Sequence, residues 1–124
     1  MWINRIKKRL LSFKYAFRGI LDLFLSHPNA RIHLVATLAV VAAGFYFGLS
    51  ACEWALVVLA ITGVLAAEAF NSALEYLTDL VSPQQNPLAG KAKDIAAGAV
   101  LILAIGAVVI GCLVFIPRVI ALIR

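Results

Sequence analysis

The chain has 124 residues, a hydrophobic share of 64%, a mean hydropathy of +1.00 and a formal net charge of +5. Soluble domains are typically about 45–50% apolar, so this composition excludes an ordinary water-exposed surface and predicts a single membrane-embedded domain. The positive charge does not indicate nucleic-acid binding. Seven of the 11 Lys and Arg lie in the first 31 residues, beside apolar segments, where basic side chains are attracted to anionic lipid head groups.

Residues 1–26 are predicted to form an amphipathic helix on the membrane surface. Apolar side chains recur at steps of three and four residues, at Ile3, Ile6, Leu10, Phe13, Phe17 and Leu21. Lys and Arg fill much of the opposite side, which is typical of a helix that lies in the interface plane rather than across the bilayer. Pro28 then interrupts the helix and permits a change of direction.

Three apolar segments follow, at residues 34–52, 54–80 and 95–117, and each is predicted to span the membrane. The first and third are long enough, without charge, to cross a hydrocarbon core of about 30 Å. The second starts at Trp54, a residue type favoured at membrane interfaces, and stays apolar as far as Ala67. Its helical pattern continues beyond the apolar part, so we expect this helix to extend into the cytosol.

Loop charges predict the orientation of these segments. The N-terminal region is strongly basic, the connection between the second and third segments contains Lys91 and Lys93, and the connection between the first two has no Lys or Arg. The positive-inside rule therefore places the N-terminus and the second connection in the cytosol, and the C-terminus with Arg118 and Arg124 outside. Three thin helices with many small residues bury little surface alone, so an oligomer is expected.

A polar stripe on the second segment is the most informative feature. Its members are Glu68, Asn71, Glu75 and Asp79, whose spacing confines them to roughly 80° of arc on one helix face. Glu68 lies about 21 Å along the helix from Trp54, still below the membrane surface. A helix end that leaves the membrane explains Glu75 and Asp79 but not Glu68, because a charge inside a span costs a few kcal/mol and usually marks a functional site.

Two further groups are candidates for binding anions or head groups. Lys91, Lys93 and Asp94 stand at the predicted cytosolic start of the third helix, where an ammonium and free backbone amides suit polyphosphate. The alternative is a membrane anchor with Asp94 as an ordinary helix cap. Asn29 and Arg31 suit head-group recognition, with snorkelling toward the interface as the alternative. The sequence has no glycine-rich P-loop, so a nucleotide site would have to be built differently.

The chain resembles the bacterial diacylglycerol kinase and undecaprenol kinase family over essentially its whole length. The matching segments are Ala30-Arg-Ile-His33, Glu68-Ala-Phe-Asn-Ser-Ala-Leu-Glu75 with Asp79, and Ala92-Lys-Asp-Ile-Ala-Ala-Gly-Ala-Val100. The resemblance implies an all-α membrane protein with a surface helix and three transmembrane helices. It implies a homotrimer in the bacterial inner membrane with active sites shared between subunits. The implied activity is transfer of the γ-phosphoryl group of ATP, with Mg²⁺, to a membrane lipid alcohol at the cytosolic face.

The resemblance also implies roles for individual residues. Glu68 would be the general base, Glu75 a metal ligand, and Asn71 and Asp79 supporting residues. The implied nucleotide contacts are Tyr15, Glu75, Lys93 and Asp94, and the implied lipid contacts are Asn29, Arg31 and Glu68. His27 occupies a position where the family commonly has a metal-binding glutamate, and imidazole is a poor ligand for a hard cation. Either fewer metal contacts suffice here, or Asn29 or another group compensates.

The substrate and one other class of protein stay open at this point. The stretches Leu80-Val-Ser-Pro83 and Lys91-Ala-Lys-Asp-Ile-Ala-Ala-Gly98 look closer to the undecaprenol branch than to the diacylglycerol branch. A smooth lipid-facing surface does not itself distinguish these two lipids. A small transporter or channel subunit without kinase activity is the alternative class. A transporter is expected to place its charges near the middle of the membrane, whereas the charges here cluster at one face.

Overall fold

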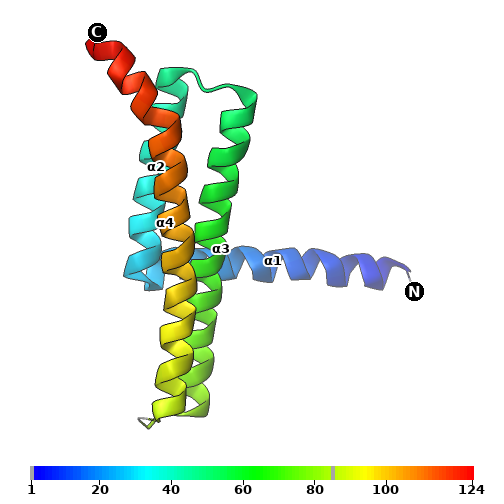
Figure 1. The fold of residues 1–124 in the computed structure, drawn as a ribbon. Coiled ribbons are helices and arrows are strands. Elements are labelled where there is room, and N and C mark those ends of the chain that lie inside the picture. The colour runs from blue at the N-terminus through cyan, green and yellow to red at the C-terminus, as the bar shows by residue number, and fades with distance from the viewer. Residues whose placement is uncertain (1, 85) are drawn as a thin grey trace.

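The computed structural model describes residues 2–84 and 86–124, and within these ranges all regular secondary structure is helical. The four helices are α1 (Trp2–Ser26), α2 (Pro28–Phe47), α3 (Ala51–Val81) and α4 (Pro87–Ile123). Helices α2, α3 and α4 run side by side, and α1 crosses their direction and projects away from them (Figure 1). Each of the three bundled helices is long and apolar enough to cross a membrane. The predicted all-α architecture is thus confirmed. Met1 and Gln85 lie outside the described residues.

Helix α2 is displaced toward the N-terminus relative to the predicted range of 34–52. It begins at Pro28, because proline at the first helical position loses no hydrogen bond and its φ already suits a helix. It ends where Gly48 adopts a left-handed conformation, with φ 62° and ψ 58°, which glycine tolerates best. The prediction followed the absence of charge and therefore started after Arg31, although this side chain lies within the first turns of the helix.

Helix α3 begins at Ala51 rather than at residue 54, because a capping box starts it earlier. The Ser50 hydroxyl accepts a hydrogen bond from the Glu53 backbone amide, and the Glu53 carboxylate accepts one from the Ser50 amide at 2.8 Å. The Glu53 carboxylate also pairs with Arg118 on α4 at 2.7 Å. Glu53 thus links the start of one transmembrane helix to the end of another.

Helix α4 is longer at both ends than the predicted range of 95–117. The Asn86 side chain caps its first turn by accepting a hydrogen bond from the Leu88 amide at 2.8 Å. The helix continues through Pro117 to Ile123. The suggestion that Asp94 caps this helix was wrong, because Asp94 lies two turns inside it. Lys93 consequently stands on the helix wall and not at a free N-terminus.

The buried core is small and sits near the α2–α3 turn. Leu49, Val57 and Val114 form its centre, with aromatic and aliphatic neighbours packed around it. Gly44 is buried in this region, and a Cβ atom there would lie 2.7 Å from the Trp54 ring. Most other large apolar side chains of the bundle are exposed, as expected for surfaces that meet lipid or other protein chains.

Candidate active site

The first part of the polar stripe of α3 is buried, whereas Glu75 is partly exposed and Asp79 is exposed. Glu68, Asn71 and Ser72 are 2%, 5% and 4% exposed, and they are the buried polar residues among those described. No other described residue forms a hydrogen bond or an ion pair with the Glu68 carboxylate. A buried carboxylate without a partner is costly, so its retention points to a functional role rather than to stability.

Asn71 and Glu75 form one unit on this face. The Asn71 side-chain amide donates a hydrogen bond to Glu75 Oε1 at 3.2 Å, while Asn71 Oδ1 is buried without a partner among the described residues. The bond orients one oxygen of the Glu75 carboxylate, and the side chain of Glu75 stays 42% exposed. Glu75 is therefore oriented by the protein and accessible from outside it.

His27 approaches the same carboxylate from the turn between α1 and α2. Its Nδ1 lies 3.9 Å from Glu75 Oε2, and its Nε2 is buried with no hydrogen-bond partner in the part of the chain that the structure describes. The imidazole meets the Tyr76 ring edge to face, with ring centroids 5.2 Å apart. The structure thus brings His27 and Glu75 together, as expected for two residues of one site.

Asp22 and Tyr76 complete the junction at which α1, His27 and α3 meet. The sequence did not single out these two residues. The Tyr76 hydroxyl donates to Asp22 Oδ2 and the Ser26 hydroxyl donates to Asp22 Oδ1, both at 2.9 Å. These two hydrogen bonds, first from Ser26 and then from Tyr76, lower the pKa of Asp22 below its ordinary value. One available signal was that Asp22 is the only acidic residue before Glu53.

Asp79 and Lys93 form an ion pair that joins the ends of α3 and α4. The pair borders a cavity of about 490 Å³ beside the connection between the two helices, lined in part by Ser82 and Gly90. Exposed ion pairs contribute little to stability, so this contact leaves the Lys93 ammonium free to exchange partners with an anionic ligand.

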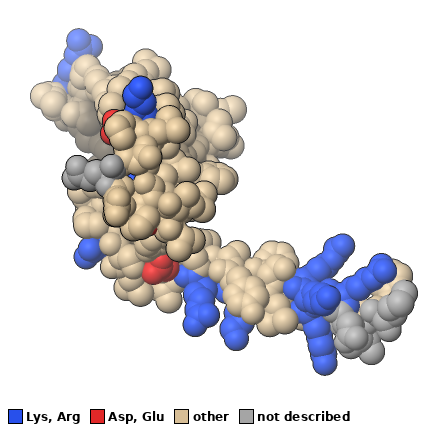
Figure 2. Space-filling view, turned by 90° about the horizontal axis from the view of Figure 1, so that it is seen from below, with Lys and Arg blue, Asp and Glu red and all other residues tan. Residues whose placement is uncertain are grey.

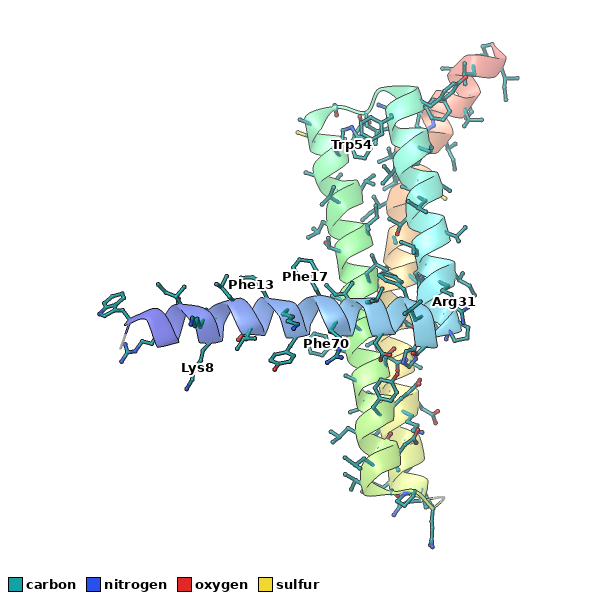
Figure 3. All side chains as sticks on the ribbon, turned by 180° about the vertical axis from the view of Figure 1, so that it is seen from behind. Lys8, Phe13, Phe17, Arg31, Trp54 and Phe70 are labelled. Atoms are coloured by element: carbon teal, nitrogen blue, oxygen red, sulfur yellow. The ribbon has the colours of Figure 1, made fainter. Side chains whose placement is uncertain are left out.

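The remaining predicted residues are not gathered into this cluster within one chain. Tyr15 is 62% exposed on α1, Asp94 is exposed on α4, and Asn29 and Arg31 are exposed at the start of α2. Figure 3 shows Arg31 at the end of α2 where α1 crosses the bundle. These side chains face outward from the single chain.

The donor set at Glu75 is small for a metal site. Across residues 2–84 and 86–124, no three His, Cys, Asp or Glu side chains come close enough to hold a metal ion. Mg²⁺ keeps several waters and is often bound by one or two carboxylates together with substrate phosphates. Glu75 fits such a role, whereas the neighbouring imidazole of His27 is a weaker donor for a hard cation.

The fold and the site together define an integral-membrane protein with a polar site on one helix face, toward one end of a three-helix bundle. Comparison with known proteins then identifies the family. Residues 14–115 match the family described as prokaryotic diacylglycerol kinase, and the chain belongs to this family. It is a membrane lipid kinase, and nothing in these comparisons favours the transporter alternative.

Three relatives illustrate the range of this similarity. The undecaprenol kinase of Bacillus subtilis is 38% identical over 93% of this chain and 94% of its own length. A diacylglycerol kinase of Synechocystis is 40% identical over 91% of this chain and 65% of its own. The diacylglycerol kinase of Escherichia coli is 29% identical over 80% of this chain and 81% of its own. Both lipid specificities therefore occur among proteins similar to this chain.

Proposed function

We propose that this protein transfers the γ-phosphoryl group of ATP to the primary hydroxyl of a long-chain membrane lipid, either diacylglycerol or undecaprenol. The observation that carries the proposal is Glu68, which is 2% exposed at the head of the polar face of α3 and whose carboxylate forms no hydrogen bond or ion pair with a described residue. In the proposed step the lipid oxygen attacks the γ-phosphorus, the bond to the β,γ-bridging oxygen breaks, and the hydroxyl proton passes to Glu68. The products are a lipid phosphate and ADP.

The candidate site residues divide between the two substrates. Glu75 lies about two turns along α3 from Glu68 and would hold Mg²⁺, with His27 beside it and Asn71 orienting it. Tyr15, Glu75, Lys93 and Asp94 would contact the nucleotide, with Asp79 positioning Lys93. Asn29 and Arg31 would contact the lipid together with Glu68. Mg²⁺ would supply neutralisation of the phosphate charge, and phosphoryl transfer depends mainly on such positioning and charge stabilisation.

The proposal includes a homotrimer in which neighbouring subunits complete each site. Two observations support it: among the described residues of one chain no three His, Cys, Asp or Glu side chains come close enough to hold a metal ion, and Tyr15 faces outward on a projecting helix. The large exposed apolar surface of α3 and α4 is available for contacts between subunits.

A side-by-side kinase assay tests the proposed function. Purified protein in liposomes is supplied with Mg²⁺ and radiolabelled ATP, and the membrane contains diacylglycerol, undecaprenol or neither. We expect a labelled lipid phosphate with at least one of the alcohols and no lipid-dependent ATP consumption in the plain liposomes. The ratio of kcat/KM for the two alcohols identifies the preferred substrate. Absence of product with both alcohols would overturn the proposal.

We also propose that the site faces the cytosol of a bacterial inner membrane, with the N-terminus on the same side. Lys and Arg side chains line α1 in Figure 2, and positively charged flanks are retained in the cytosol. With Cys112 replaced by alanine, the exposed native Cys52 should react with an impermeant maleimide added to intact cells. With both native cysteines replaced, Gln84→Cys should react only after permeabilisation. Labelling of Gln84→Cys from outside would reverse this orientation.

A further inference from the structure

Helix α1 is attached to the rest of the molecule only near its C-terminal end. Figure 1 shows it projecting beyond the bundle, and every described side chain from Arg5 to Asp22 is exposed. Leu23 is its one buried residue among those described. Little apolar packing therefore fixes the direction in which α1 leaves the bundle.

The interface between α1 and α3 is loosely filled. Small residues on both helices, including Gly19, Ala69 and Ala73, line a cavity of about 420 Å³ that also reaches Asp22 and Tyr76. Across this gap, the bond from the Tyr76 hydroxyl to Asp22 Oδ2 is the only side-chain hydrogen bond that joins α1 to another helix in the described part of the chain. Its loss would leave α1 free to change its angle.

Asp22 is prepared to act as the acceptor of this bond. The Ser26 hydroxyl, one turn away on α1, holds the other carboxylate oxygen. Asp22 is ionised at neutral pH like any ordinary aspartate, and the two hydrogen bonds lower its pKa further. A hydrogen bond to an ionised acceptor is stronger than one between neutral groups, so this single bond can hold α1 against α3.

Tyr76 connects its hydrogen bond with Asp22 to the residues that are assigned to the nucleotide. It directly follows Glu75, and its ring supports the His27 imidazole whose Nδ1 faces the Glu75 carboxylate. His27 directly follows α1 and precedes α2. A change in the angle of α1 would therefore move His27 relative to Glu75 and would also displace Tyr15.

We propose that Asp22 and Tyr76 are positioning residues that hold α1 and His27 in the arrangement that binds Mg²⁺-ATP. The inference rests on the proposed function, because it assigns the nucleotide to Tyr15 and Glu75. Without the bond, only a fraction of molecules has α1 correctly placed, and the apparent affinity for the nucleotide falls by that fraction. Saturating nucleotide selects the correct arrangement, so the rate at saturation is retained.

The test is a full steady-state analysis of Tyr76→Phe, which keeps the ring against His27 and removes the donor. We expect the KM for Mg²⁺-ATP to rise about 3- to 10-fold, with little change in kcat. This rise in KM corresponds to about one tenth to one third of the molecules keeping α1 in place. The KM for the lipid should stay the same, because Asn29 and Arg31 lie on α2.

Asp22→Ala should give the same increase in the KM for Mg²⁺-ATP without altering α3, and the double variant should raise this KM no further. Asp22→Asn should restore most of the affinity, because its amide oxygen still accepts the bond.

Tyr46→Phe is the matched control, since Tyr46 is exposed near the opposite end of the bundle and its hydroxyl forms no described hydrogen bond. It should behave as the unmodified protein. An unchanged KM for Mg²⁺-ATP in both Tyr76→Phe and Asp22→Ala would overturn the positioning role. So would a loss of kcat at constant KM, which would mean that the bond serves only folding. An unmodified protein that phosphorylates neither lipid would overturn the proposed function instead.

Discussion

Glu68→Gln is expected to lower kcat for lipid phosphorylation by about 10²–10⁴, the usual contribution of a general base. Glutamine keeps the shape of the side chain but cannot take the proton from the lipid hydroxyl. Assembly should survive, because the substitution removes a buried charge that lacks a partner in the described structure. Mg²⁺-ATP binding should also survive, because Lys93 and Glu75 are unchanged.

The measurement combines the kinase rate, equilibrium binding of a non-hydrolysable ATP analogue and the oligomeric state in the same lipid. Glu53→Gln is the matched control: the same chemical change on the same helix, at the end where Glu53 pairs with Arg118. It should reduce stability more than rate. Near-normal turnover of a correctly assembled Glu68→Gln protein would remove Glu68 from the mechanism.

Glu75→Gln is expected to raise the Mg²⁺ concentration for half-maximal activity about tenfold or more, with the KM for the lipid unchanged. Mg²⁺ prefers charged oxygen ligands, and Glu75 is the carboxylate at the His27 junction that Asn71 orients. Glutamine can still accept the hydrogen bond from Asn71, so the local geometry should persist. A Mg²⁺ titration at fixed ATP measures the effect, and an unaltered titration would show that Glu75 does not bind the metal.

His27→Glu in the same titration shows whether His27 belongs to the metal site. The imidazole already lies 3.9 Å from the Glu75 carboxylate, so a glutamate at this position would place a second carboxylate beside the first. We expect the half-saturating Mg²⁺ concentration to fall. No change would mean that His27 serves the Tyr76 contact instead of the metal.

Much of the fold was predictable because its signals are local. A transmembrane helix depends on the apolar length of one segment, and residues 34–52 and 95–117 met that requirement without any charge. The second span was recognised from the apolar residues 54–67 and the helical pattern that continues beyond them. The polar face of α3 was equally predictable, because helical periodicity alone places Glu68, Asn71, Glu75 and Asp79 on one side. The helix ends were predicted less well, because they depend on caps such as Ser50 and Asn86 rather than on charge.

The sequence by itself determined the membrane class, the number of spans and the position of the polar face, since each follows from hydrophobicity and periodicity along one helix. Only the tertiary structure showed that Tyr76 bonds to Asp22, 54 residues away, and that Arg118 bonds to Glu53, 65 residues away. Such contacts depend on the angle and register at which helices cross. Small residues permit several of these arrangements, so no pattern within a single helix specifies which one forms.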